Sequence, residues 1–337
     1  MRKSILWFSW SVIFALVIFW AVPGVFAAGK VVVYSTNQQA QNDMMATAFE
    51  QATGIKCEMV RAGSGVTIKR IRAERGRPLG DVALGMSKII LLNNMDLWEP
   101  YKIKDLDIYP EEFKDPNGMW IGQMVHVMAF VYNTKLLSAD QAPKGWSDFL
   151  DPKWQDRVAY CNPNNSGSAY TQLSIMLQLW GDDENGWKKV EKVLKHAKIT
   201  QQSSLVYKGV AEGEFPSGIT MEYAGYRYKK GGAPVEVVYP EDGTVAYTEG
   251  AAIIKGAKNR ENARKFLDWA SSLDARKKIV SQFMRRPARP DIDFTELVPG
   301  MLPLAKIKKV QGYDRAYWTK RRPEILKKVK DALLRIK

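Results

Sequence analysis

The sequence predicts an α/β protein built as two lobes, each with a mostly parallel sheet flanked by helices. Three observations support this fold class. Short apolar runs alternate with longer amphipathic runs over residues 30–86, a similar alternation returns over 158–240, and extended runs at 125–137 and 244–259 lead between the two sets. Because strands that alternate with helices build helix-covered parallel sheets, each set is expected to form one lobe.

The composition is that of a folded protein with a real core. The chain has 337 residues, of which 46% are hydrophobic and 11% aromatic. It contains neither a Gly/Ser-rich linker nor an internal repeat. Two lobes joined by extended strands, without a flexible tether, indicate a hinged clamshell with its ligand between the lobes.

The first 27 residues are expected to form a secretory signal peptide. Arg2 and Lys3 precede an apolar run over 5–22, a Pro-Gly pair follows, and small residues place cleavage after Ala27. An uncleaved anchor is the alternative, because a run of about 18 apolar residues can span a bilayer. Position 28 is alanine and not cysteine, so no lipid anchor is indicated, and export points to a Gram-negative periplasm.

The elements of the first lobe follow from periodicity and breakers. A helix over 39–54 would place Met44, Met45, Ala48 and Phe49 on one face and end at a glycine. The other elements expected here are strands at 30–37, 55–61 and 79–86 and a helix at 66–78.

The rest of the chain predicts a second lobe, a return and a tail. Expected are a crossing strand at 125–137, a helix and a strand within 145–163, helices at 168–180 and 183–197, an α/β stretch at 209–240, a crossing strand at 244–259, a helical pair at 260–283 and an amphipathic tail at 320–337. The predicted lobes are therefore 28–124 plus 249–292 and 125–248 plus 293–337. The apolar stripe of the tail is expected to pack on the second lobe, and comprises Ile325, Leu326, Val329, Leu333 and Leu334.

Charge and cysteine content restrict the partners. The formal net charge is +14, of which Arg2 and Lys3 contribute two, and a basic balance favours anionic partners. Export argues against nucleic acid. Cys57 and Cys161 are 104 residues apart and outside any CxxC motif, so two buried free thiols are favoured over a disulfide. His126 and His196 do not form a zinc-ligand spacing, and we expect no metal and no cofactor.

Three polar turns at strand ends are the candidate binding site. Such turns supply hydroxyl groups, unpaired backbone N–H groups and small residues that admit a ligand, so together they could hold a tetrahedral oxyanion. Each turn taken alone is more often only a helix cap. The three turns are Ser35-Thr36-Asn37, Gly63-Ser64-Gly65 and Ser166-Gly167-Ser168.

Several stretches, in this order along residues 30–292, resemble the periplasmic solute-binding proteins of ABC transporters, in the branch with the ferric-iron, hexose-phosphate, phosphonate and polyamine receptors. The stretches are VVVYSTN, RAGSGVTIKRIRAE with LGDVALG, VYNTKLL, KGWSDFLDPKWQDRVAYCNPNNSGSAY, YKGVAEGEFPSGITMEY and GAAIIKGAKNRENARKFLDW. The resemblance implies a monomeric receptor that closes on a small solute and docks on a membrane permease coupled to a cytoplasmic ATPase, with no membrane contact except through that permease.

Within this family the residues favour an anion over iron. The iron-binding members carry two adjacent tyrosines and a first-lobe histidine or carboxylate, because Fe(III) prefers anionic oxygen donors. Here Tyr223, Tyr226 and Tyr228 are separated, and serine, threonine and asparagine follow Tyr34. The resemblance instead implies a phosphate cradle at the three polar turns, with a ferric-iron receptor as the alternative.

Further residues are expected to contact the rest of the solute. Glu222 would accept hydrogen bonds from sugar hydroxyls or an ammonium group at the end remote from the phosphate, and Tyr223 would line the wall, as Tyr239 could. Ser203 and Ser204 match a family turn that faces the cleft. Arg286 and Arg289 could reach a phosphate, but the prolines around them favour a structural turn.

Two other functional classes compete with transport. A hydrolase is disfavoured because the sequence lacks a GxSxG motif, and neither a P-loop nor a GxGxxG fingerprint is present. We therefore expect no enzyme activity. A ligand-binding sensor subunit for a membrane kinase or chemoreceptor would use the same clamshell, and stays the alternative from another class.

Overall fold

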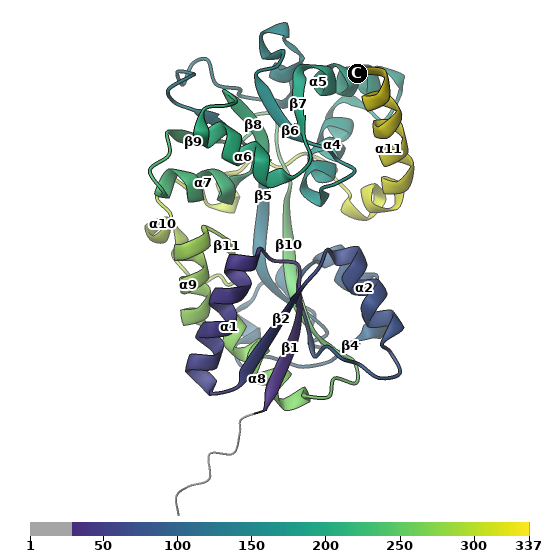
Figure 1. The fold of residues 1–337 in the computed structure, drawn as a ribbon, viewed down its shortest axis with the longest axis vertical. Coiled ribbons are helices and arrows are strands. Elements are labelled where there is room, and N and C mark those ends of the chain that lie inside the picture. The colour runs from purple at the N-terminus through teal and green to yellow at the C-terminus, as the bar shows by residue number, and fades with distance from the viewer. Residues whose placement is uncertain (1–28, 337) are drawn as a thin grey trace, which may run out of the picture.

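The computed structural model describes residues 29–336, so the expected signal peptide lies outside the described residues. Two α/β lobes lie end to end, and two long strands run between them (Figure 1). The strand order is β2-β1-β3-β10-β5-β8-β6-β7, with β4 on β10 and with β9 and β11 on β5. The predicted fold class is confirmed.

The first lobe contains the three parallel strands β2, β1 and β3. Its elements are β1 (Lys30–Ser35), α1 (Gln39–Thr53), β2 (Lys56–Arg61), α2 (Ser64–Ala73), β3 (Val82–Ser87), α3 (Lys88–Leu92), β4 (Trp98–Glu99), α8 (Arg260–Ser271) and α9 (Leu273–Phe283), with 3₁₀ turns at Met95–Leu97, Leu106–Ile108 and Glu111–Phe113.

The second lobe contains the three parallel strands β7, β6 and β8. Its elements are β6 (Val158–Cys161), α4 (Gly167–Trp180), α5 (Glu184–His196), β7 (Ala197–Thr200), α6 (Ser203–Glu212), β8 (Ser217–Met221), α7 (Glu222–Lys230), β9 (Val235–Val238), α10 (Phe294–Leu297) and α11 (Arg315–Ile336). The helix expected before β6 consists of two 3₁₀ turns, Trp146–Leu150 and Pro152–Trp154, and a further turn covers Leu304–Lys306.

The strands β5 (Ile121–Asn133) and β10 (Ala246–Ile254) join the lobes, and the short β11 (Arg286–Pro287) pairs with β5. The part of β5 up to Val127 pairs antiparallel with β10, and the part from Met128 pairs with β8. All thirteen residues of β5 are buried. Strand β5 therefore belongs to the sheets of both lobes, and its middle lies where the two lobes meet.

A β-bulge at Gly250 changes the direction of strand β10 next to the cleft. The register with both neighbouring strands shifts at Gly250. A Cβ atom on Gly250 would lie 2.5 Å from the Ile121 carbonyl oxygen, so only glycine fits here. Bulges of this kind redirect the adjacent side chain, in this case Glu249.

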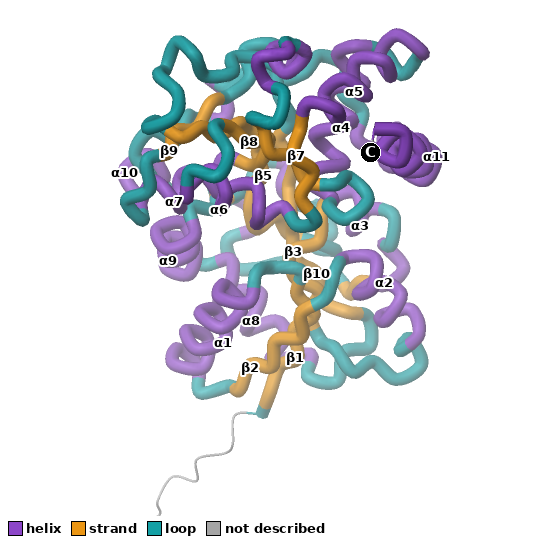
Figure 2. Tube along the Cα trace, turned by 45° about the horizontal axis from the view of Figure 1, so that its top comes forward, coloured by secondary structure: helices purple, strands orange, loops and turns teal. Residues whose placement is uncertain are grey.

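The helical faces predicted from periodicity are largely buried. Met45 and Phe49 of α1 are fully buried, while Met44 and Ala48 are half-buried. In the tail, α11 packs beside α4 and α5 (Figure 2) through Ile325 and Val329.

Leu334 does not belong to this apolar stripe, contrary to expectation, because it is 65% exposed near the end of α11. Cys57 and Cys161 are both buried free thiols, as favoured from the sequence.

Candidate functional site

A cleft of about 1180 Å³ lies between the lobes. Its walls come from the loops at the carboxyl ends of the parallel strands, and its floor comes from the middle of β5 and β10 and from the segment after α9. This is the place where ligands collect in open α/β sheets, because helix N-termini converge there.

The second-lobe wall carries a group of small hydroxyl residues, which we call the serine corner: Ser166, Gly167, Ser168, Ser203 and Ser204. The hydroxyl oxygen of Ser166 lies 2.6 Å from that of Ser203 and 2.9 Å from that of Ser168. Ser166 also caps α4 by accepting a hydrogen bond from the Ala169 N–H. The starts of α4 and α6 are thereby held together, which brings the first N–H groups of two helices close to one another.

An asparagine turn brings the chain from β6 into the serine corner. The Asn165 N–H donates to the Asn162 carbonyl oxygen at 2.9 Å, and the Asn164 N–H donates to the Asn162 side chain at 3.0 Å. Asparagine suits such turns because its side chain bonds to the backbone two residues on. Local sequence therefore specifies the strand, turn and helix start.

The first-lobe wall is built by the turn after β1 and the start of α2. The Thr36 hydroxyl donates to the Gly85 carbonyl oxygen at 2.6 Å. Gly85 has φ of +77°, and a Cβ atom there would lie 2.6 Å from the Thr36 hydroxyl. Arg61, at the end of β2, donates from Nε to the Asn37 carbonyl oxygen at 3.0 Å. These contacts hold the wall without using carboxylates.

Four side chains reach across the cleft. Gln38 of the first lobe donates from Nε2 to the hydroxyl groups of Tyr207 and Tyr223, at 3.2 and 3.4 Å. Arg227 of α7 donates to Oε1 of Gln38 at 2.9 Å. Burial raises the pKa of the Tyr207 phenol, which therefore stays a neutral hydrogen-bonding group. The lobes are in direct polar contact through Gln38.

A hydrogen-bonded pair of side chains lies on the floor between the two crossing strands. His126 Nε2 of β5 lies 2.7 Å from a carboxylate oxygen of Glu249 of β10. Burial raises the pKa of the Glu249 carboxyl, but His126, Arg285 and Arg315 more than offset this and hold it below its ordinary value. The imidazole ring also stacks on Tyr247, with ring centroids 5.2 Å apart. Glu249 is the one carboxylate among the described residues that line this cleft.

Most of the residues predicted from the sequence line the cleft, and whether they bind a ligand stays a prediction. The lining includes Thr36, Asn37, Gly63, Ser64, Ser166, Gly167, Ser168, Ser203, Ser204 and Tyr223. Ser35 is fully buried and donates to Asn42 Oδ1 at 2.8 Å, so its hydroxyl supports the turn from behind. Gly65 is exposed outside the cleft lining.

The expectation that Glu222 faces the ligand is wrong. Its side chain is 1% exposed and forms two hydrogen bonds with Arg286, at 2.8 and 2.7 Å, while Tyr239 donates to it at 2.6 Å. Glu222 therefore neutralises a buried guanidinium group behind the wall. Tyr239 is half-buried beside this pair and does not line the cleft.

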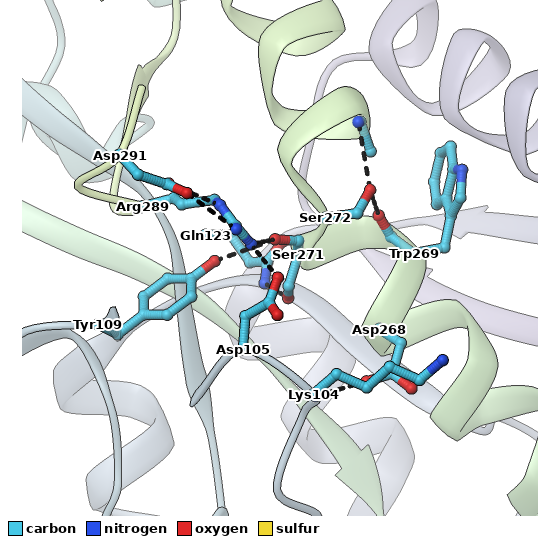
Figure 3. A network of polar contacts seen from close by, with 11 residues as sticks. Lys104, Asp105, Tyr109, Gln123, Asp268, Trp269, Ser271, Ser272, Arg289 and Asp291 are labelled. Atoms are coloured by element: carbon cyan, nitrogen blue, oxygen red, sulfur yellow. Dashed lines mark hydrogen bonds and ion pairs between the residues drawn. The ribbon is translucent and has the colours of Figure 1, made fainter. Parts of the chain in front are cut away.

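Arg289 is structural, as the surrounding prolines favoured. Figure 3 shows its guanidinium group between two acids: Nε donates to Asp291 at 2.7 Å, and NH1 donates to Asp105 at 2.7 Å. NH1 also donates to the Ser271 carbonyl oxygen at 2.9 Å. This network ties the segment after α9 to the first lobe.

Sequence reasoning missed the floor and the bridge across the cleft, which consist of Gln38, Tyr207, Arg227, His126, Tyr247, Glu249 and Arg285. For two of them the sequence holds a signal. His126 and Glu249 are polar residues inside otherwise apolar strand stretches, VHVMAFV and TEGAAII. A titratable group in such a run needs a partner, because burying it alone is costly.

The described chain shows no candidate metal site and no candidate membrane-spanning helix. No group of three or more His, Cys, Asp or Glu side chains in residues 29–336 could hold a metal ion. Over the same residues, none of the helices combines the length and the apolar character needed to cross a bilayer.

Comparison with known proteins places this fold and cleft in context. A family model described as bacterial extracellular solute-binding protein matches residues 90–318. A protein of Haemophilus influenzae described as uncharacterized is 31% identical over 255 residues, which cover 73% of this chain and 74% of that relative. A putative 2-aminoethylphosphonate-binding periplasmic protein of Salmonella typhimurium is 25% identical over 262 residues, 73% of each chain.

Solved structures of other proteins share this fold over 90% of the chain. The periplasmic binding protein AfuA from Actinobacillus pleuropneumoniae, with exogenous fructose-6-phosphate bound, gives a TM-score of 0.78 at 27% identity and covers 90% of this chain and 98% of its own. Iron-bound HitA from Pseudomonas aeruginosa gives a TM-score of 0.75 at 23% identity, with 90% and 99% covered, and shows the shared fold.

Proposed function

The chain belongs to the bacterial extracellular solute-binding proteins, of the type that serves ABC importers, and from this premise we propose that it captures a small phosphorylated or phosphonate-bearing anion. The observation that carries the proposal is the serine corner, where two helix starts and three hydroxyl groups meet. Such a cradle stabilises an oxyanion by hydrogen bonds and helix dipoles without a full counter-ion. The solute stays releasable, as transport requires.

The charges that line the cleft also support an anion. Arg61, Arg227 and Arg285 face it, and the carboxylate of Glu249 is already paired with His126. An excess of guanidinium groups in a concave site raises the local concentration of anions. The structure of AfuA with fructose-6-phosphate gives a related protein with a phosphorylated ligand.

Ferric iron is the second candidate ligand. The phenols of Tyr207 and Tyr223 approach one another at Gln38, and phenolate oxygen is a preferred donor for Fe(III). Against this, burial raises the pKa of the Tyr207 phenol, and the arginines of the cleft repel a cation.

A thermal-shift and calorimetry series tests the choice of ligand. The purified protein is titrated with fructose-6-phosphate, 2-aminoethylphosphonate and ferric citrate, because a ligand that binds only the folded state raises the melting temperature. A shift with the phosphorylated compounds is expected. A shift with ferric citrate alone, together with a phenolate-to-iron absorption band, would establish the iron receptor instead.

A variant of the serine corner tests the site. Ser168→Glu places a negative charge at the cradle and should lower the affinity for fructose-6-phosphate at least 100-fold without changing the fold. Ser138→Glu, on an exposed turn outside the cleft, is the matched control and should bind within twofold of the original protein. If Ser168→Glu kept its affinity for fructose-6-phosphate, the serine corner would only cap the helices and would not bind the ligand.

The cellular setting and partners form part of the same proposal. The protein acts in the periplasm as a monomer, with lobes of residues 28–124 plus 249–292 and 125–248 plus 293–337, and delivers its unmodified solute to an ABC permease. Co-purification with the permease in nanodiscs, dependent on solute, would test this.

A further inference from the structure

Three arginines lie within the six residues that follow helix α9, and one of them has contacts unlike those of the other two. Met284 ends the helix with φ of 54°, a left-handed conformation that turns the chain toward the cleft. Arg285, Arg286 and Arg289 are then each no more than 6% exposed. Arg286 is paired with Glu222, and Arg289 is paired with Asp105 and Asp291.

Arg285 has no such partner. Within residues 29–336 it forms no ion pair with a carboxylate, and its Nε atom is buried without a hydrogen-bond partner. Its guanidinium carbon lies 3.6 Å from the centre of the Tyr223 ring, and its NH1 lies 3.4 Å from both ring nitrogens of His126. Unlike the other two arginines, it lines the cleft.

The neighbouring charges leave this guanidinium group available to a ligand. Glu249 contacts His126, at 2.7 Å, and within the described residues it forms no hydrogen bond or ion pair with Arg285. A further guanidinium group, that of Arg315, lies 3.8 Å from the centre of the Tyr247 ring, on which His126 stacks. A buried charge is normally paired, so an unpaired one that faces a cleft indicates a counter-ion supplied by the solute.

Arg285 and the serine corner occupy different parts of the cleft. The serine corner lies at the starts of α4 and α6, whereas Arg285 lies on the floor, against the Tyr223 ring. The side chains of Tyr207 and Tyr223 are joined through Gln38, and Tyr223 contacts Arg285. The volume of about 1180 Å³ leaves room for a solute that reaches both.

We propose that Arg285 is a second anion-binding position, and that the preferred solute is a phosphorylated compound with a second, separate anionic group, a carboxylate or another phosphate. This rests on the proposed function, because the first anionic group would occupy the serine corner. An ammonium group at that end is disfavoured, since Glu222 is buried in its pair with Arg286 and Glu249 is engaged by His126.

Calorimetry with four probes tests the inference: 3-phosphoglycerate and fructose-1,6-bisphosphate carry two anionic groups, fructose-6-phosphate carries one, and 2-aminoethylphosphonate carries one with an ammonium group. The original protein should bind at least one of the two doubly anionic probes at least tenfold more tightly than fructose-6-phosphate. Arg285→Gln should weaken the doubly anionic probe at least tenfold more than it weakens fructose-6-phosphate, which removes that advantage, and the remaining fructose-6-phosphate binding shows that the variant is folded. Arg285→Lys should keep part of the advantage.

The control is Arg77→Gln, which removes one exposed positive charge outside the cleft and should preserve the ranking of the probes. The role of Arg285 would be refuted if the original protein bound singly and doubly anionic probes equally well, or if it bound 2-aminoethylphosphonate most tightly. Either result would still be compatible with phosphate binding at the serine corner. Failure of every phosphorylated probe to bind would refute the proposed function itself. The order of the probe affinities in the original protein tests the proposal even if Arg285→Gln does not fold.

Discussion

Replacing Glu222 by glutamine separates a structural role from a ligand-binding role. Three hydrogen bonds end on this carboxylate: two from Arg286, at 2.8 and 2.7 Å, and one from Tyr239, at 2.6 Å. Both members of the ion pair are 1% exposed. Glutamine keeps the shape but not the charge, and leaves a buried guanidinium group without its counter-ion. Breaking one side of a buried pair costs about 3–5 kcal/mol of unfolding free energy.

The assay is urea unfolding followed by tryptophan fluorescence, with ligand affinity measured on the folded variant. Glu236→Gln is the matched control, because Glu236 pairs with Lys229 while both side chains are about 40% exposed. Exposed pairs contribute about 0–1 kcal/mol. The double variant Glu222→Leu with Arg286→Met should recover much of the lost stability, because it leaves no unpaired charge. A loss below about 1 kcal/mol together with altered ligand affinity would refute the structural role.

Three further perturbations test the cleft and its support. Gln38→Ala removes the hydrogen bonds across the cleft, so the ligand-free protein should open and its radius of gyration in X-ray scattering should rise; an unchanged value would contradict the bridging role. The pKa of Glu249 in the folded protein is held below its ordinary value of 4.5. The ionised carboxylate therefore stabilises the fold at pH values above 4.5, and this stabilisation is lost as the pH falls through the lowered pKa of the folded protein. Glu249→Gln should therefore flatten the acid side of the stability curve, and parallel curves would disprove the effect. In Gly225→Ala the new Cβ would lie 2.4 Å from Val237 Cγ2, so urea unfolding should show a loss of about 1–3 kcal/mol, and full stability would show that α7 can shift.

Much of the cleft could be predicted because its walls are made of local sequence signals. The part of the serine corner from Ser166 to Ser168 follows a strand, an asparagine turn and a capped helix start, all within a short stretch of chain. The predicted turns at Thr36 and Ser64 likewise lie at strand ends. In a parallel sheet these ends share one edge, so the residues that follow them come together.

The floor could not be predicted, since it depends on pairings between distant residues. His126 and Glu249 are 123 positions apart, and Glu222 and Arg286 are 64 apart. Nothing near Glu222 in the sequence indicates that an arginine from the segment after α9 will neutralise it. The same holds for Arg285, which follows helix α9 beside Arg286 yet faces the cleft.

The sequence by itself determined the α/β class, the two lobes and the hydroxyl-rich turns, because periodicity, capping and turn formation act over a few residues. Only the tertiary structure decided which charges are neutralised inside the protein and which stay unpaired at the cleft. The physical reason is that a buried charge takes its partner from whatever packs against it, and the register of β5 with β10 and the turn after α9 set that packing.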